Sequence, residues 1–256
     1  MIIGAQLYTA REFCKDLENL SETLKKVADI GYKTVQLSGT CDCEPQWFKE
    51  QLDANGLKCV LTHTRGDRII ADPKKVCDEH KVYDCRNIGL GMISGGRDLT
   101  EEKYLKFVAD FKPAAKEIAA NGCKFFFHNH CEEFTARFNG KSCIDRMLED
   151  FAPEELNFTL DTYWVQYAGC DTCEYLERLK GRVECIHLKD MAVDPATWGH
   201  RMAAVGSGNM NFPKIIDVAG KCGTEYLIVE QDNCYGEDPF ECLKRSYNYL
   251  RSLGLE

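Results

Sequence analysis

The chain alternates throughout between two kinds of segment. One is a short run of apolar and β-branched residues, which predicts a β-strand; the other is longer, with apolar residues at the spacing of an amphipathic helix. Strands that alternate with helices pair in parallel, because each helix carries the chain back to the start of the next strand. This alternation restricts the chain to an α/β fold built on a parallel sheet.

Eight strands and eight helices are expected. The strands are predicted over Ile2–Leu7, Thr34–Leu37, Lys58–Thr62, Asn87–Leu90, Cys123–Phe127, Leu156–Leu160, Val183–Leu188 and Tyr226–Val229. The helices are predicted over Leu17–Ile30, Pro45–Ala54, Pro73–Tyr83, Glu101–Ala120, Ser142–Asp150, Thr172–Leu179, from Asn211 or Phe212 to Cys222, and over Pro239–Leu250. An eightfold repeat in 256 residues is typical of a closed (β/α)8 TIM barrel. No GxGxxG motif follows the first strand, which disfavours a dinucleotide-binding sheet. We predict one barrel domain over residues 1–256.

The charge and the cysteines exclude several classes of protein. A formal net charge of −9 argues against nucleic acid as a partner, because phosphate backbones require basic surface. No apolar run is long enough for a transmembrane helix, and the N-terminal segment lacks the pattern of a signal peptide. With 15 cysteines spread along the chain, we expect a reduced, cytoplasmic protein with free thiols and no membrane partner. Cys170 and Cys173 form a CxxC without a second pair at zinc-ribbon spacing, so a structural zinc site is not expected.

Four of the predicted strands end in an ionisable residue. The segments are FFFHNH, FTLDTYW, CIHLKD and LIVEQD, and they supply His128, Asp161, His187 and Glu230. In a barrel the C-terminal ends of the strands surround one mouth, so these side chains are expected to share a single divalent metal ion. Two imidazoles with two carboxylates suit Mn²⁺, Zn²⁺, Fe²⁺ or Co²⁺ better than an all-oxygen calcium site, and Mg²⁺ is a further candidate.

Two other polar residues follow the fifth strand. His130 lies two residues after His128, so both side chains point to the same side of an extended chain. His130 is therefore an alternative ligand to His128 or a general acid/base beside it. Glu133, with its neighbour Glu132, is a candidate catalytic carboxylate or a binder of sugar hydroxyls; the alternative is a solvated pair in a loop.

Five residues are candidates for contact with a substrate: His63, Lys189, Trp164, Tyr8 and Arg201. His63 ends the third strand and has a packed core histidine as its alternative. Lys189 suits an oxyanion or hydroxyl, unless it pairs with Asp190 or Glu230. Aromatic rings stack on the C–H faces of sugars, although they also fill cores. Arg201 lies in the longest stretch without a predicted element, from Met191 to Met210, which would cover the barrel mouth.

Several longer segments carry a resemblance to a known family. They include GAQLYTAR, GYKTVQLSG, FHNHCEEF, LDTYWVQYAG, GRVECIHLKDM, AVGSGNMNF and IVEQDNCYGEDPFECLKRSYNYL. With these the chain resembles the sugar phosphate isomerase/epimerase family, which has the xylose-isomerase-like barrel. The resemblance implies a divalent metal ion bound by Glu, Asp, His and Glu at the ends of strands five to eight. Asp161, His187 and Glu230 match the last three positions.

Two positions depart from the family pattern. His128 stands where epimerases of the family often have Glu, and Ser207 stands where many relatives have Glu. The two metal-bound glutamates of those epimerases act as acid and base on opposite faces of the sugar. Of that pair only Glu230 is present here, and His130 or Glu133 would have to supply the other role.

The resemblance implies proton abstraction next to a carbonyl through a metal-stabilised enediolate. The expected activity is isomerisation or epimerisation of a sugar or sugar phosphate, a small carbohydrate substrate. Alternatives are a metal-dependent lyase or hydrolase of 3-keto-glycosides with the same enolate chemistry, and a non-catalytic, metal-containing sugar-binding barrel. An abasic-site endonuclease shares the barrel but needs more metal ligands and a basic face. Barrels of this kind often pair, so a homodimer is an expected assembly.

Overall fold

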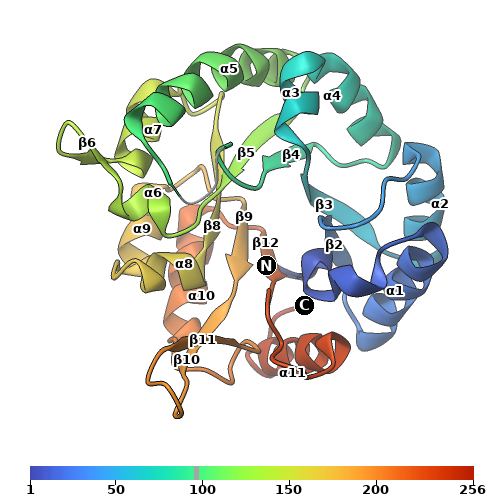
Figure 1. The fold of residues 1–256 in the computed structure, drawn as a ribbon. Coiled ribbons are helices and arrows are strands. Elements are labelled where there is room, and N and C mark those ends of the chain that lie inside the picture. Colours follow the sequence, from blue (N-terminus) through green and yellow to red (C-terminus); the bar gives the residue numbers. More distant parts are fainter. Residues whose placement is uncertain (95–97) are drawn as a thin grey trace.

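The closed barrel expected from the alternation is present in the computed structural model, which describes residues 1–94 and 98–256. Parallel strands close a ring in the order β1-β12-β9-β8-β5-β4-β3-β2, and helices surround it (Figure 1). The barrel strands are β1 (Ile2–Gln6), β2 (Thr34–Leu37), β3 (Lys58–His63), β4 (Asn87–Leu90), β5 (Lys124–His128), β8 (Asn157–Asp161), β9 (Cys185–Leu188) and β12 (Tyr226–Val229). The fold class predicted from the sequence is therefore confirmed.

The long helices correspond to the predicted ones. They are α1 (Leu17–Ile30), α2 (Pro45–Asn55), α4 (Pro73–Val82), α5 (Glu101–Ala120), α7 (Cys143–Asp150), α9 (Thr172–Arg178), α10 (Phe212–Cys222) and α11 (Pro239–Ser252). Short elements that were not predicted lie in the loops: the 3-10 helix η1 (Leu7–Phe13), α3 (Gly66–Ala71), α6 (Glu132–Thr135), α8 (Thr162–Tyr167) and the strands β6 (Arg137–Phe138) and β7 (Lys141–Ser142). In the described ranges no helix combines the length and the apolar character needed to cross a lipid bilayer.

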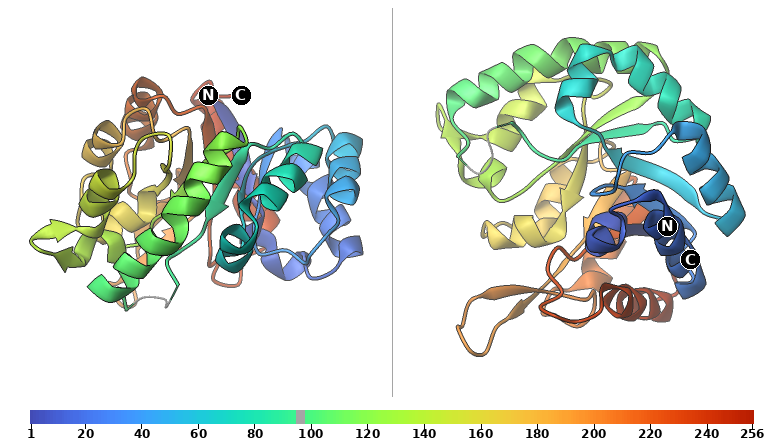
Figure 2. Two further views of the ribbon diagram at one scale, coloured as in Figure 1. Left: turned by 90° about the horizontal axis from the view of Figure 1, so that it is seen from above. Right: turned by 45° about the vertical axis from the view of Figure 1, so that its right-hand side comes forward.

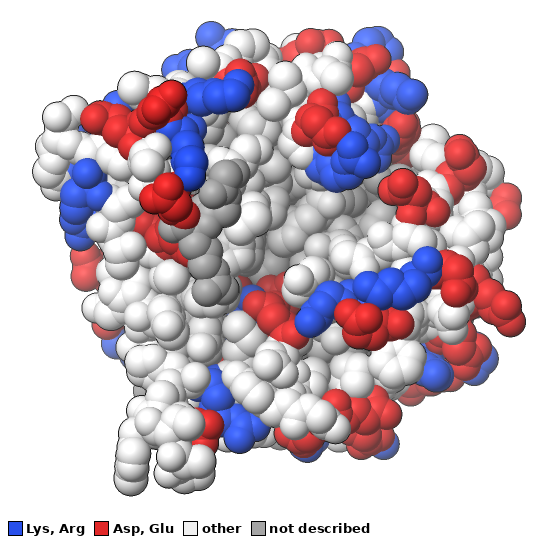
Figure 3. All heavy atoms as spheres, in the orientation of Figure 1, with Lys and Arg blue, Asp and Glu red and all other residues white. Residues whose placement is uncertain are grey.

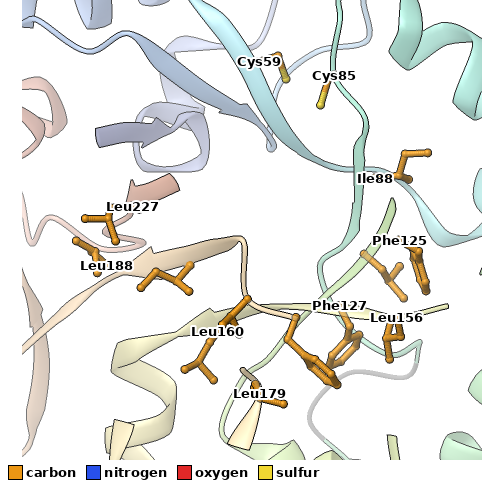
Figure 4. Packing of buried hydrophobic residues seen from close by; sticks show 14 of the residues in the cluster. Cys59, Cys85, Ile88, Phe125, Phe127, Leu156, Leu160, Leu179, Leu188 and Leu227 are labelled. Atoms are coloured by element: carbon orange, nitrogen blue, oxygen red, sulfur yellow. The ribbon is translucent and has the colours of Figure 1, made fainter. Parts of the chain in front are cut away.

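Strand side chains alternate between two apolar layers. The outward-facing residues belong to the main core, where Figure 4 shows Phe125, Phe127 and Leu188, and the two Phe rings pack against rings of helix α5. The residues between them belong to a separate small cluster, which includes Phe126, Cys185 and Ile228. Because successive side chains of a strand point to opposite faces, this second cluster fills the interior of the barrel.

Two glycines leave room inside the barrel near the end of β4. A Cβ atom on Gly89 would lie 2.2 Å from the Thr62 carbonyl oxygen, and one on Gly91 would lie 3.3 Å from His63 Nδ1. Side chains at these positions would therefore collide with β3 and crowd the His63 imidazole. Gly89 in β4 and Gly91 just after it thus leave the space that the His63 ring occupies.

The chain termini and the barrel mouth lie at opposite ends of the molecule. The N- and C-termini lie together (Figure 2), and Ile3 N donates a 2.6 Å hydrogen bond to Glu256 O. At the mouth, the stretch from Met191 to Met210 is more regular than its sequence indicated. It forms most of an antiparallel hairpin, β10 (Asp190–Val193) and β11 (His200–Ala203), which projects from the barrel (Figure 1).

Asp190 holds the loop that follows this hairpin. Its buried carboxylate accepts hydrogen bonds from the backbone N–H groups of Met191 (2.8 Å), Gly206 (3.0 Å), Gly208 (2.8 Å) and Met210 (3.3 Å). The exposed Ser207 lies within this loop, where relatives were expected to have Glu. Four donors on one carboxylate explain why an otherwise irregular segment has a defined path.

Asp190→Asn should lower the free energy of unfolding by about 2 kcal/mol, because its NH₂ group would face backbone donors in place of an acceptor oxygen. Urea denaturation followed by circular dichroism measures this loss. Asp194→Asn is the control, since Asp194 lies at the exposed hairpin tip and accepts from Ala196 N. Equal stability of the two variants would contradict the role given to Asp190.

Candidate metal centre

Four side chains from neighbouring strands meet in the barrel mouth. They are His128 at the end of β5, Asp161 at the end of β8, His187 in β9 and Glu230 directly after β12, and together they are called the ligand group below. Each offers one ligand atom, and these atoms all lie within 4.8 Å of one another. All four residues are buried. The structure thus brings together the four residues that the strand ends indicated.

The register of the strands explains why these side chains meet. His128, His187 and Glu230 each lie two residues beyond a member of the inner apolar cluster: Phe126, Cys185 and Ile228 respectively. With a period of two, they point to the same interior face one layer higher. Asp161 pairs in register with His187 across β8 and β9, which places the fourth ligand at that level.

Both imidazoles of the ligand group are held by one nitrogen and present the other to the centre. His128 Nδ1 donates to Gly91 O at 3.0 Å, and His187 Nε2 donates to Gln36 Oε1 at 2.6 Å. These bonds place a proton on the outer nitrogen of each ring, so the inner nitrogen, which faces the carboxylates, is the one that a metal ion would bind. Such outer hydrogen bonds are the usual way in which proteins orient metal-binding histidines.

The inner nitrogens face carboxylate oxygens across short distances. His128 Nε2 lies 3.3 Å from Asp161 Oδ2, and His187 Nδ1 lies 2.9 Å from Glu230 Oε2 and 3.7 Å from Asp161 Oδ2. Nevertheless, His187 Nδ1 and Glu230 Oε2 are buried without a hydrogen-bond partner among the described residues. A divalent ion between the four ligands would satisfy both atoms, so this set of donors fits a metal site.

Charge at the centre shifts the ionisation of its members. Burial lowers the pKa of His187, but the Glu230 and Asp161 carboxylates outweigh burial and raise that pKa to about 9. Burial raises the pKa of each carboxyl group, yet the Lys189 ammonium and the imidazoles hold the pKa values of Asp161 and Glu230 well below their usual range. Both carboxylates are therefore charged at neutral pH and available to a cation.

Lys189 lies inside this cluster. Its Nζ is 2.9 Å from Asp161 Oδ2 and 2.8 Å from Glu230 Oε2, and it donates a hydrogen bond to Asp232 Oδ2 at 3.0 Å. Burial lowers the pKa of Lys189, but these three carboxylates raise it well above the usual value. Of the alternatives considered for Lys189, the ion pair with Glu230 is formed.

Two further histidines surround the ligand group. The His63 ring lies 5.1 Å from that of His128 and 5.7 Å from that of His187, and His63 Nδ1 is 3.2 Å from Ser38 Oγ. The His130 ring meets that of His128 edge-on at 4.8 Å. Burial, followed by the charge of His128, lowers the pKa of His63 well below its usual value and that of His130 to about 3. Both rings are therefore neutral at physiological pH.

The other predicted contact residues lie at varying depth. Trp164 is buried, 5.4 Å from the His130 ring, with Lys189 Nζ 5.6 Å from its own ring, so it forms one wall of the centre. Tyr8 is half-buried in η1 beneath the Arg11 guanidinium, 4.5 Å from its ring centre. Arg201 lies on β11 over the Tyr235 ring at 4.4 Å. Neither Tyr8 nor Arg201 has a described contact with the ligand group.

Glu133 is not the solvated loop residue that was considered as an alternative. It is 3% exposed, and its Oε2 accepts a 2.8 Å hydrogen bond from His130 N. Burial raises its pKa to about 7. This bond stabilises the turn between β5 and α6, and it ties the carboxylate to the backbone of the HNH segment.

Three residues at the centre were not predicted from sequence: Gln36, Asn129 and Asp232. Gln36 is fully buried and orients His187, and Asn129 Oδ1 accepts from Asp161 N at 3.0 Å. Asp232 anchors Lys189. A polar residue inside a predicted strand, as in TVQL, is the available sequence signal for Gln36, since strand interiors disfavour unpaired polar groups. The partners themselves come from distant parts of the chain.

The mouth is hollow and its rim carries charges of both signs (Figure 3). A cavity of about 420 Å³ opens beside His63 between the ends of β2 and β3, and Ser38 and Thr62 also line it. A larger cavity of about 770 Å³ lies at the opposite end of the strands, near Lys58 and Lys124. Neither cavity is lined by a member of the ligand group. The smaller one is nearer to the centre, because His63, whose ring lies beside those of His128 and His187, lines it.

Comparisons with known proteins agree with this architecture. Inosose dehydratase from Geobacillus thermodenitrificans (strain NG80-2) is 23% identical over 168 residues, covering 59% of this chain and 55% of that protein. The chain spans about half the length of the curated relatives it matches. A sugar phosphate isomerase/epimerase from Parabacteroides distasonis ATCC 8503 has a similar structure, with a TM-score of 0.79, 24% identity and 97% coverage of both chains.

A xylose isomerase-like TIM barrel protein from Mycobacterium smegmatis, solved in complex with magnesium, is also similar, with a TM-score of 0.75. Its identity is 13%, and the match covers 98% of this chain and 96% of that one. At these identities the solved structures show the fold. The sequence profile of one family, described as xylose isomerase-like TIM barrel, matches residues 24–253. The chain therefore belongs to the xylose isomerase-like TIM barrel family.

Proposed function

We propose that this protein is a divalent-metal-dependent sugar isomerase or epimerase that removes a proton next to a carbonyl group. The observation that carries the proposal is the orientation of two imidazoles, each held by its outer nitrogen so that its inner nitrogen faces two charged carboxylates. A divalent ion held by the ligand group would act as a Lewis acid on substrate oxygens and lower the cost of the charge left by proton removal. Similarity to a sugar phosphate isomerase/epimerase supports a carbohydrate substrate.

Glu230 is the proposed base. It is a buried carboxylate whose pKa lies well below the usual range, so it is charged at neutral pH and poised at the centre. His130 is the proposed partner that holds or returns the proton. Its neutral ring has a buried Nδ1 without a described hydrogen-bond partner, which a substrate hydroxyl would supply. Trp164 and His63 would orient the sugar by stacking and by hydrogen bonding.

The outcome after proton removal depends on where the proton returns. Epimerisation requires acid and base groups on both faces of the sugar, but His128 replaces the second glutamate and Glu133 is bonded to a backbone N–H. Return of the proton on the same face to the neighbouring carbon gives aldose–ketose isomerisation, which needs one such group. We therefore favour isomerisation over epimerisation.

Elimination is the second candidate, because the curated relatives are inosose dehydratases. A dehydratase removes a proton and then loses a leaving group from the next carbon, so the first step is shared. The corresponding substrates are sugars already oxidised to ketones, including 3-keto-glycosides. Here the same residues would serve, with Glu230 as base and a neutral histidine as proton donor to the leaving group.

The protein with Mn²⁺ should exchange a substrate hydrogen next to a carbonyl for deuterium when keto- and aldo-sugars are incubated in D₂O. Proton NMR follows the exchange and also separates the candidates, because isomerisation gives a new sugar and elimination gives an unsaturated ketone. Glu230→Gln should reduce exchange by at least roughly a hundredfold, the scale of a lost general base. Glu237→Gln, which changes an exposed carboxylate paired with Arg245, is the control. Measurable sugar binding without exchange would indicate a sugar-binding protein.

Binding of Mn²⁺ at pH 7 should release about one proton, because His187, with a pKa of about 9, must lose its Nδ1 proton to become a ligand. Affinity should therefore rise with pH up to about pH 9 and level off above it. Calorimetry in buffers of different ionisation enthalpy measures the number of protons released. A binding enthalpy that is independent of the buffer would contradict this assignment of His187.

The hydrogen bond from His187 to Gln36 should also matter for ion binding. Gln36→Met keeps the length of the side chain but removes the acceptor, so the imidazole loses the bond that fixes its tautomer. Affinity for Mn²⁺ should fall by roughly tenfold or more, as is usual when such an outer partner of a ligand is removed. Calorimetric titration measures it, and Gln51→Met on helix α2 serves as the control. Unchanged affinity would show that Gln36 does not orient His187.

A further inference from the structure

Lys189 contacts the same oxygen atoms that the ligand group presents to its centre. Its Nζ lies 2.9 Å from Asp161 Oδ2 and 2.8 Å from Glu230 Oε2, and the side chain is 1% exposed. Those two oxygens are also the ones nearest to the inner nitrogens of His128 and His187. One ammonium group and one divalent ion therefore require the same pair of carboxylate oxygens.

Asp232 provides a third carboxylate that lies outside the ligand group. It pairs with the Lys189 ammonium and accepts a hydrogen bond from it at 3.0 Å, a distance close to those of Asp161 and Glu230. Asp232 is also nearer the surface, with 25% of its side chain exposed, and its carbonyl oxygen accepts from Arg11 Nη1 at 2.9 Å. Lys189 thus has an anchor that does not depend on the two ligand carboxylates.

The centre holds more carboxylates than ammonium groups. With both imidazoles of the ligand group in the neutral form that binds a metal ion, Asp161, Glu230 and Asp232 with the Lys189 ammonium carry a formal charge of −2. A divalent ion neutralises this charge of −2. If Lys189 and Asp232 were absent, the carboxylates of Asp161 and Glu230 would by themselves balance the charge of the ion. The lysine and the aspartate therefore form an extra, oppositely charged pair placed beside the site, and burial makes its interactions strong.

We propose that Lys189 is an internal counter-ion that competes with the divalent ion for Asp161 and Glu230, while Asp232 retains Lys189 when the ion is bound. The proposal rests on the metal site of the proposed function and concerns how that site is regulated. Lys189 stabilises the buried carboxylates when no ion is present, at the expense of ion affinity. Asp232 favours the ion-bound state because it offers the displaced ammonium a charged partner.

A purely structural role makes the opposite prediction for one variant. If Lys189 only held Asp161 and Glu230 in position, its removal would disorder two ligands and weaken ion binding. If Lys189 competes with the ion, its removal strengthens binding, because a like charge has left the neighbourhood. If Lys189 competes with the ion, loss of the Asp232 charge weakens ion binding, whereas under a purely structural role that loss weakens binding or leaves it unchanged. The sign of the change in Lys189→Met therefore separates the two roles.

The test is calorimetric titration of Mn²⁺ into the full chain at pH 7.5, after chelation and dialysis. Lys189→Met should bind Mn²⁺ at least roughly tenfold more tightly than the wild type, and Asp232→Asn roughly tenfold more weakly. Lys124→Met is the matched control, since Lys124 forms an ion pair with Glu184 at the opposite end of the barrel and should leave the affinity unchanged. Equal or weaker binding by Lys189→Met would overturn the proposal.

Thermal unfolding gives a second readout that does not depend on activity. Without metal, Lys189→Met should melt below the wild type, because two buried carboxylates lose their counter-ion, and added Mn²⁺ should raise its Tm by more than it raises that of the wild type. If Lys189→Met cannot be purified in either state, Asp232→Asn decides: wild-type affinity in that variant rejects the proposal. Failure of the wild type itself to bind any divalent ion would instead overturn the metal site, and this proposal with it.

Discussion

The alternation of side chains along closed parallel strands is the constraint on which this structure depends. Every second strand residue packs outward against a helix, and the residues between them must fill a narrow interior. Phe126, Cys185 and Ile228 form an apolar layer in that interior. His128, His187 and Glu230 lie two residues further along the chain, so the two-residue period points their side chains into the mouth. The site is therefore a continuation of the core, with polar residues in the last layer.

Placing charges in that layer has an energetic cost that the surrounding groups offset. Buried carboxylates are tolerated only with partners, and here the partners in the structure are an ammonium group and two imidazoles. Gly91 and Gln36 each accept a hydrogen bond from the outer nitrogen of one imidazole, so the other nitrogen of each ring points toward the carboxylates. The buried carboxylates cost free energy of folding, and the same carboxylates attract a cation. Binding of a cation at the mouth would therefore also stabilise the fold.

Sequence patterns predicted the barrel, and they predicted that His128, Asp161, His187 and Glu230 lie together, because both follow from local rules. Strand and helix periods identify the elements, and an ionisable residue at the end of an apolar run is placed at the barrel mouth. They predicted the loops poorly: the hairpin β10–β11 and the short helices α6 and α8 were missed, since their stability comes from particular contacts such as those of Asp190 with four backbone amides. Arg201, a predicted substrate contact, lies on this hairpin over the Tyr235 ring.

The sequence by itself determined the period of the strands, their number, and which residue stands at each strand end, because these are properties of short segments. Only the tertiary structure decided which side chains are in contact around the barrel mouth. Barrel closure brings together Gln36 and His187, and it places Lys189 among three carboxylates. Folding of the HNH segment places Glu133 against the backbone N–H of His130. Electrostatic interactions act through space at a few ångströms, and no local pattern records them.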